Sequence, residues 1–263
     1  MLRKILMASA IAAACAAVPA IASAAPAQNW TGFYVGVNGG YGGDKVHFDG
    51  AGTYTDYAPD PDLDSPAAVS AKANATSSGF IGGAQVGYNF MVSDNLIVGA
   101  EADIDVTDIK AQADLSGTST GGATGTASAK IGSKIDYLGT VRARVGMPMF
   151  EGRFVPYLAG GLAYGRVHSY ADASFSGFLN EGSTSTGSFS LDHTKTQTGW
   201  TLGGGADYAL TDRLSFRAEY LYVDLGKDRI YNDSFDINDG YVDAVVDMKT
   251  TANIVRVGMN YRF

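Results

Sequence analysis

Apolar and polar side chains alternate at every second position in eight segments of the chain, and helical spacing of apolar residues is absent. Each segment has roughly the length that a tilted membrane strand needs. One of them, 154–165, is apolar on both faces, so its facing is open. The eight segments are 30–41, 79–90, 96–105, 134–146, 154–165, 199–210, 214–225 and 250–263.

Charged side chains in these segments alternate with large apolar ones. In 134–146 the alternation sets Ile135, Tyr137, Val141, Ala143 and Val145 against Asp136, Thr140, Arg142 and Arg144. A soluble sandwich would turn the apolar face inward, whereas a membrane barrel turns it toward lipid and keeps the charges inside. Alternation alone does not distinguish the two. The candidate interior charges are Glu101, Asp103, Arg142, Arg144, Arg217, Glu219 and Arg256.

The lengths of the connections favour the membrane barrel. Polar connections of 37, 28, 33 and 24 residues alternate strictly with connections of five, seven and three residues. Long loops without secondary structure are uncommon in compact soluble domains, but outer-membrane barrels combine short periplasmic turns with long surface loops. We therefore predict an all-β fold: an eight-stranded antiparallel up-and-down transmembrane β-barrel of the outer-membrane type, with both mature termini in the periplasm.

The first residues have the pattern of a cleaved signal peptide. Arg3 and Lys4 precede an apolar run over 5–18, and small residues occupy 22–24. We place cleavage after Ala24, because cleavage after Ala25 would leave Pro26 at the new terminus. The domains are then a helical signal at 1–24 and a barrel at 25–263. Cys15 leaves with the signal, which excludes disulfides and cysteine metal sites from the mature chain.

Charge and composition narrow the class of protein further. Without the signal the chain has 17 basic and 27 acidic side chains, a net charge of −10. An acidic chain without a basic cluster is a poor candidate for nucleic-acid binding. No apolar run long enough for a transmembrane helix follows the signal, so a spanning structure has to be a closed barrel.

The chain ends in a pattern similar to the outer-membrane assembly signal. A polar residue, Gly258, Tyr261 and a terminal Phe263 occupy its characteristic positions, and aromatic rings suit the lipid–water interface. The stretch 30–36, with 199–205 and 214–226, resembles the alphaproteobacterial small outer-membrane β-barrels, a porin-like family of the opacity type. The resemblance covers all eight segments and is absent from the loops. It implies an eight-stranded barrel but no single activity.

The inward charges have two interpretations. Unpaired charges in a narrow interior are costly, so acids and bases should neutralise one another, with Arg142 and Arg144 near Glu101 and Asp103. The network is then either a structural plug of salt bridges or the gate of a small pore. Inward glycines leave space for water or serve tight curvature: Gly83, Gly87, Gly99, Gly203 and Gly205.

Three further sets of residues are weaker candidates. Alternating aspartates at 56–64 and 233–247 suggest calcium, but neither set completes a known loop pattern. Some members of the family that the chain resembles bind haem, so the resemblance implies His47, His168 and His193 as candidate haem ligands. His168 with Ser169, or His193 with Ser190 and Asp192, could be imagined as parts of a hydrolase, but no signature supports this. We predict no enzyme activity, no cofactor and no metal.

The sequence predicts a structural, surface-exposed component of the envelope that shapes its permeability. The alternatives are a narrow porin for small solutes and a surface receptor, for example for haem. The expected partners are outer-membrane lipid and lipopolysaccharide and the outer-membrane assembly machinery, with a homo-oligomer possible.

Overall fold

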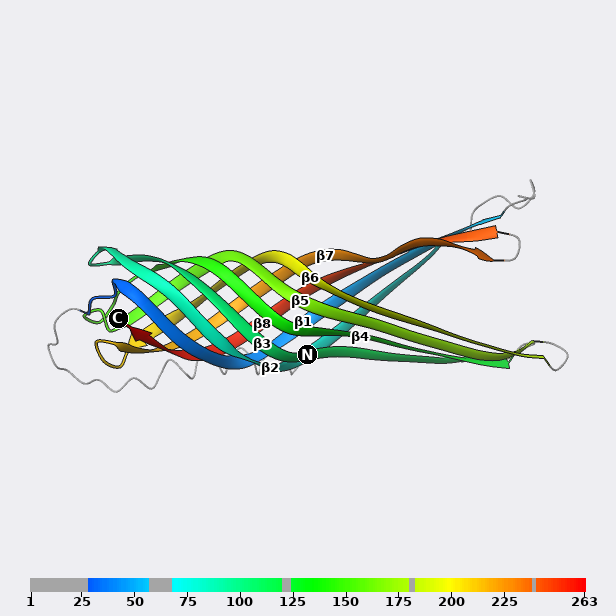
Figure 1. The fold of residues 1–263 in the computed structure, drawn as a ribbon, viewed down its shortest axis with the longest axis horizontal. Coiled ribbons are helices and arrows are strands. Elements are labelled where there is room, and N and C mark those ends of the chain that lie inside the picture. Colours follow the sequence, from blue (N-terminus) through cyan, green and yellow to red (C-terminus); the bar gives the residue numbers. More distant parts are fainter. Residues whose placement is uncertain (1–27, 57–67, 120–123, 180–182, 238–239) are drawn as a thin grey trace.

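The computed structural model describes residues 28–56, 68–119, 124–179, 183–237 and 240–263, which form eight antiparallel strands closed into a barrel (Figure 1). Each strand pairs with the next along the sequence and the last pairs with the first, which confirms the up-and-down topology. Within the described ranges no helix has the length and hydropathy to cross a bilayer. The strands are β1 (Gly32–Asp56), β2 (Ala68–Ser93), β3 (Leu96–Ser119), β4 (Thr124–Gly146), β5 (Phe154–Leu179), β6 (Ser183–Ala209), β7 (Leu214–Ile237) and β8 (Gly240–Arg262).

The strands are about twice as long as the sequence predicts. β1 continues to Asp56 and β4 begins at Thr124, so much of each predicted loop is an antiparallel hairpin. The prediction of long loops without secondary structure is therefore wrong. These stretches are rich in Ser, Thr, Gly and Ala, a composition typical of loops, yet a paired strand in water keeps its backbone hydrogen bonds whatever its side chains.

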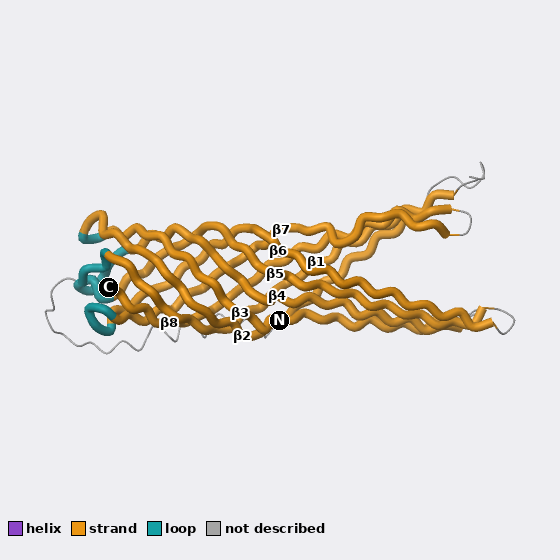
Figure 2. The backbone as a smooth tube through the Cα atoms, viewed as in Figure 1, coloured by secondary structure: helices purple, strands orange, loops and turns teal. Residues whose placement is uncertain are grey.

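The barrel forks into two sheets at the end with the long hairpins. Pairing between β2 and β3 stops at Ile81 and Thr107, and pairing between β6 and β7 stops at Trp200 and Asp224. Beyond these points β2, β1, β8 and β7 form one four-stranded sheet, the first arm, and β3 to β6 form another, the second arm. Figures 1 and 2 show the arms diverging.

The opposite end of the barrel, the short-turn end, carries the connections 94–95, 147–153 and 210–213. The first is shorter than predicted, because β2 runs on to Ser93. The chain terminus at Phe263 lies at this end (Figure 1). The short and long connections therefore lie at opposite ends of the barrel.

The outer face of the barrel carries large apolar side chains. Phe33, Phe80 and Leu162 expose 62%, 75% and 70% of their surface. An apolar face of this size is typical of a barrel surrounded by lipid. The structure also gives the facing of 154–165, because Leu158 points outward while Tyr157 is buried inside.

A β-bulge on β4 reverses the facing of its side chains. The alternation predicts Ile135 on the outward face, but Ile135 is buried in the interior with 1% of its surface exposed. One extra residue in the ladder between Ile135 and Tyr137 causes the difference, since a one-residue slip exchanges the two faces of a strand. A second bulge, between Asp224 and Lys227, does the same on β7.

The interior near the fork is apolar. A cluster of side chains from β1, β2, β4, β5, β7 and β8 packs there with almost no exposed surface, and we call it the apolar plug. In the lipid-facing part of the barrel, apolar side chains point outward and charged side chains point inward. At the apolar plug, apolar side chains point inward, as in a water-soluble protein. The apolar plug consists of Val46, Ile81, Ile135, Leu138, Ala163, Val167, Leu221, Val223, Leu225, Met248, Ala252 and Ile254.

Candidate functional site

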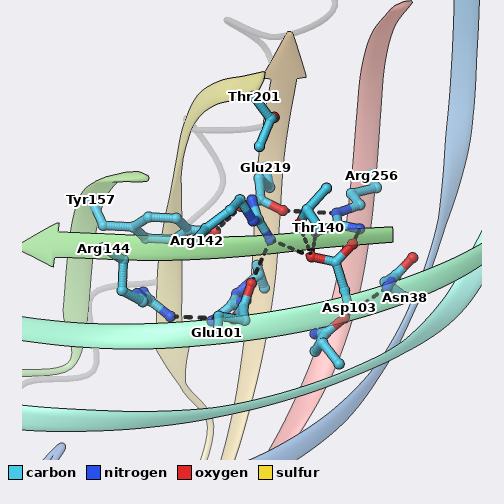
Figure 3. A network of polar contacts seen from close by, with 12 residues as sticks. Asn38, Glu101, Asp103, Thr140, Arg142, Arg144, Tyr157, Thr201, Glu219 and Arg256 are labelled. Carbon is cyan, nitrogen blue, oxygen red and sulfur yellow. Dashed lines mark hydrogen bonds and ion pairs between the residues drawn. The ribbon is translucent and has the colours of Figure 1, made fainter. Parts of the chain in front are cut away.

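The seven charged residues singled out in the sequence meet in the barrel interior and form an ion-pair network (Figure 3). They come from β3, β4, β7 and β8, and each leaves less than a tenth of its surface exposed. Glu101 and Arg142 are direct partners in the β3–β4 register. Every second side chain of a strand points into the barrel, so inward positions on these four strands bring the charged side chains together.

Arg142 is the centre of the network. Its Nη2 donates to Glu101 Oε1 at 2.5 Å and to Asp103 Oδ2 at 2.9 Å, and its Nη1 donates to Glu219 Oε1 at 2.7 Å. The planar guanidinium therefore joins carboxylates from β3 and β7 across the barrel. The hydroxyl of Thr140 also donates to Asp103, at 2.5 Å.

The layer nearer the short-turn end is built around Asp207 on β6. Arg144 Nη2 lies 2.6 Å from Asp207 Oδ2, and Arg217 Nε lies 2.7 Å from Asp207 Oδ1. Arg217 also forms an ion pair with Glu101, which links this layer to Arg142. The guanidinium of Arg144 lies 3.9 Å above the ring centre of Tyr157.

The layer nearer the fork is built around Arg256 on β8. Its Nε donates to Glu219 Oε2 at 2.7 Å, and its Nη1 donates to Asp105 Oδ2 at 2.7 Å and to Asp103 Oδ1 at 3.2 Å. Five carboxylates and four guanidiniums are thus connected by ion pairs in three layers, and only Arg142 Nε and Asp105 Oδ1 among their buried atoms have no hydrogen-bond partner. Continuous pairing is what keeps buried charges tolerable.

The sequence reasoning missed part of this network. Asp105 and Asp207 were on the polar faces of their segments but were not assigned to it, and inward parity alone would have added them. Tyr34 and Tyr157 donate their hydroxyls to Glu101 and Glu219, the second at 2.9 Å. Tyr157 had no signal, because its segment is apolar on both faces.

Two inward glycines leave room for neighbouring side chains. A Cβ on Gly87 would collide with the ring of Tyr34, and one on Gly205 would lie 3.0 Å from the hydroxyl of Tyr157. At Gly87 the absence of a side chain therefore makes room for a tyrosine of the network, whereas at Gly205 it first makes room for the Ala218 carbonyl oxygen, which lies closer still to the Cβ position.

The short-turn end is closed by the start of the described chain. Trp30 is buried against Ile97, Val155 and Ala209, and its indole Nε1 donates to the carbonyl of Gly152 at 2.6 Å. The Arg262 guanidinium lies 4.8 Å from the centre of the same ring. A cavity of about 10 Å³ remains beside Trp30, with room for about one water molecule.

The histidines lie apart, beyond the network. His47 is on β1 in the first arm, and His168 and His193 are on β5 and β6 in the second. His168 pairs with Thr194 and Ser169 pairs with His193, so the two histidines of the second arm point to opposite faces of their sheet. Among the described residues no group of three or more His, Cys, Asp or Glu is placed to hold a metal ion.

The residues of the predicted assembly signal lie at the C-terminal end of the chain. Tyr261 and Phe263 point outward with their ring centres 5.4 Å apart, and Gly258 faces the interior. The Phe263 amide donates to the carbonyl of Phe33 at 3.0 Å. The predicted cleavage residues Ala24 and Ala25, the predicted signal helix and the predicted acidic residues Asp60, Asp62 and Asp64 lie outside the described residues.

A closed eight-stranded barrel with an apolar exterior and paired interior charges defines an outer-membrane type of protein. The model of the outer membrane protein beta-barrel domain matches residues 8–263, and the chain belongs to this family. Members of the family are generally non-enzymatic. The chain is therefore an outer-membrane β-barrel protein of the Gram-negative envelope.

The chain matches alphaproteobacterial outer-membrane proteins over most of its length. The chain is 35% identical to the 31 kDa outer-membrane immunogenic protein of Brucella melitensis biotype 1, covering 93% of this chain and 89% of the relative. It is 27% identical to a 22 kDa outer membrane protein of Rhizobium leguminosarum bv. viciae, covering 90% and 80%. The crystal structure of OprG from Pseudomonas aeruginosa aligns with a TM-score of 0.43 at 15% identity, covering 91% and 100%.

Proposed function

We propose that this protein is a structural component of the outer membrane whose barrel is closed to solutes. In this proposal the mature chain begins after a cleaved signal, its short turns lie in the periplasm, and its arms stand outside the cell. The outer face contacts lipid and lipopolysaccharide, and the terminal residues Tyr261 and Phe263 serve recognition by the assembly machinery. The observation that carries the proposal is that side chains fill the barrel interior at three successive levels.

Three successive obstacles support a closed barrel. Trp30 and Arg262 cover the short-turn end. The ion-pair network crosses the middle, where Arg142 bridges β3 and β7. The apolar plug follows near the fork. Eight-stranded barrels are narrow enough for side chains to fill them, so a continuous water path would require several of these groups to move together.

The two alternatives have less support. A narrow porin needs a polar path, but the apolar plug lies across that path above the charges. A haem receptor needs histidines near one another or near an apolar cleft, and His168 and His193 face opposite sides of their sheet. Both alternatives remain outcomes of the experiments below.

The test is electrical. The mature protein is reconstituted into planar bilayers beside an Arg142→Ala variant, with folding verified by heat-modifiable mobility in gel electrophoresis. We expect no discrete current steps from either protein, because the apolar plug remains when the network is weakened. A general porin reconstituted in the same way serves as the positive control.

Discrete current steps from the folded wild-type protein would overturn the closed barrel. If the size or ion preference of those steps changed in Arg142→Ala, the narrow-porin function would replace the structural one. A spectral change on adding haem that disappears with histidine substitutions would favour the receptor.

A further inference from the structure

A cationic patch lies on the outer face of the first arm, next to the edge of the apolar exterior. Outward positions along β1 run from Tyr41 through Gly43 to Lys45, so the first cation comes two outward positions after the last aromatic ring. Lys227 on β7 and Lys249 on β8 are direct partners in the ladder, and Lys45 lies on the neighbouring β1. The patch therefore consists of three ammonium groups on three adjacent strands.

The bulge on β7 creates this patch. Before the bulge, odd-numbered side chains such as Arg217 and Glu219 point inward, so an unbroken alternation would bury Lys227. The extra residue between Asp224 and Lys227 reverses the facing, which leaves Lys227 exposed and turns Asp228 inward. Gly226 adopts a left-handed conformation at this point, with φ of 80°.

Asp224 holds the bulge and one of the lysines. Its Oδ1 accepts a hydrogen bond from the Gly226 amide at 2.9 Å, and its Oδ2 lies 2.8 Å from Lys249 Nζ. The hydrogen bond to Asp224 raises the pKa of the Lys249 ammonium, which stays charged at neutral pH. One carboxylate thus fixes the position of Lys249 opposite Lys227.

The charges of the patch are not balanced. Like charges that face each other directly across two strands destabilise a sheet unless an anion lies between them. Asp224 provides one negative charge for Lys45, Lys227 and Lys249, and its carboxylate is 10% exposed. The acids Asp49 and Asp247 lie one or two outward positions further from the apolar exterior, where Asp247 pairs with Arg229 at 3.0 Å.

The second arm shows the opposite arrangement at the corresponding place. Lys110 and Lys134 are also direct partners in the ladder, between β3 and β4. Each lies 2.7 Å from a carboxylate of its own strand, Asp108 for Lys110 and Asp136 for Lys134, and Asp136 also lies 3.9 Å from Arg166. One lysine pair of the molecule is neutralised by its own strand, and the other retains an excess of positive charge.

We propose that Lys45, Lys227 and Lys249 form a binding site for the phosphate groups of lipid in the outer leaflet. A phosphate between Lys227 and Lys249 would supply the missing negative charge, and the site lies at the edge of the apolar exterior, where lipid headgroups lie. The inference rests on the proposed orientation, which puts the arms in the outer leaflet and beyond. It names the group of the lipopolysaccharide that the barrel recognises.

The test compares two matched double variants of the mature protein, K227Q/K249Q and K110Q/K134Q. Each removes two lysines that face each other across a ladder, and folding of both is checked by heat-modifiable mobility. The proteins are incubated in mixed micelles with bisphosphorylated lipid A or with the same lipid after removal of its phosphates. Native mass spectrometry then counts the lipid molecules retained by each protein.

We expect wild type and K110Q/K134Q to retain phosphorylated lipid A in preference to the dephosphorylated lipid. In K227Q/K249Q we expect roughly thirtyfold weaker retention of the phosphorylated form, as the loss of two surface cations predicts. Equal retention by all three proteins, or equal weakening in both variants, would overturn the site. Displacement by millimolar inorganic phosphate at constant ionic strength would instead assign the lysines to a free anion.

This result is separate from the conductance test. A barrel that conducts ions but loses lipid in K227Q/K249Q would overturn the closed barrel and keep the lipid site. A barrel without current steps whose lipid retention is unchanged in K227Q/K249Q would keep the closed barrel and overturn the lipid site.

Discussion

Arg142 joins three carboxylates in the middle of the barrel with no exposed side-chain surface of its own. A buried ion pair gains little over an apolar pair of the same shape, because the desolvation of both charges offsets their attraction. Removal of one partner is different, since the remaining buried charges lose part of their compensation. The stability of the barrel therefore depends on keeping the network complete.

We expect Arg142→Met to destabilise the folded barrel by about 3–5 kcal/mol, because Glu101, Asp103 and Glu219 lose their shared partner. Urea unfolding in lipid vesicles, followed by tryptophan fluorescence, measures the change. The matched control is Arg166→Gln. Arg166 is half exposed and 3.9 Å from Asp136, and an exposed pair of this kind contributes about 0–1 kcal/mol. Equal effects of the two substitutions would contradict the central position of Arg142.

The alternation of residues carries much of this site but not its geometry. A side chain on a strand points either inward or outward, so the alternation in the sequence is enough to place Glu101, Arg142 and Glu219 inside the same barrel. Which guanidinium meets which carboxylate depends on the stagger between strands that are distant in sequence, such as β3 and β7. The contribution of Tyr157 depends on tertiary packing, because no pattern in its own segment distinguishes its face.

At the scale of the strand, the bulges of β4 and β7 divide each strand into two stretches with opposite rules. A strand period of two holds only while the ladder is regular, and a single extra residue exchanges the faces. Ile135 and Lys227 both depend on this exchange. Gly226 is a local sequence sign of the β7 bulge, and the β4 bulge has no comparable sign. When the bulges are not taken into account, the period-two pattern breaks where the facing changes, so the sequence pattern predicts strands that end there.

Glycines mark the two points where the arms separate. A Cβ on Gly199 would lie 2.8 Å from Leu225 Cα and closer still to the carbonyl oxygen of Asp224, and a Cβ on Gly79 would lie 2.8 Å from the Ile109 amide nitrogen. Each glycine thus packs directly against backbone of the neighbouring strand close to the end of the ladder between the arms. Backbone atoms cannot rotate away as a side chain can.

We expect Gly199→Ala to lower the free energy of unfolding by about 1–3 kcal/mol, because the added methyl group overpacks against the β7 backbone. Gly39→Ala is the control, since the nearest atom to its Cβ is 3.9 Å away. Urea unfolding gives the two free energies. Hydrogen exchange should show faster exchange near Asp224 only in Gly199→Ala, and no difference between the variants would remove the packing role of this glycine.

At the scale of the molecule, the barrel is a lipid-spanning cylinder that continues into two water-exposed sheets (Figures 1 and 2). The number of strands, their order and the contrast between short and long connections follow from the sequence, because the inverted pattern and the turn lengths are local. The fork does not follow from it. It arises because β2–β3 and β6–β7 pairing stops while the strands continue.

The orientation can be tested with cysteine labelling, because Cys15 is the only cysteine of the chain and lies in the predicted signal. Lys130→Cys is placed in the second arm and Asp212→Cys in a short turn, and both positions are exposed. We expect a membrane-impermeant maleimide to label Lys130→Cys on intact cells, and Asp212→Cys only after the outer membrane is permeabilised. The reverse result would invert the proposed orientation.

The fork also means that, in the part of the chain that the structure describes, the backbone ladders between the two arms end at Ile81 and Trp200. An insertion or deletion in one hairpin shifts the register of its own sheet and stops at the fork, so the other sheet keeps its shape. The molecule presents two surfaces that can diversify independently on one common foundation. One of these surfaces can therefore change in length or sequence while the other keeps its backbone arrangement.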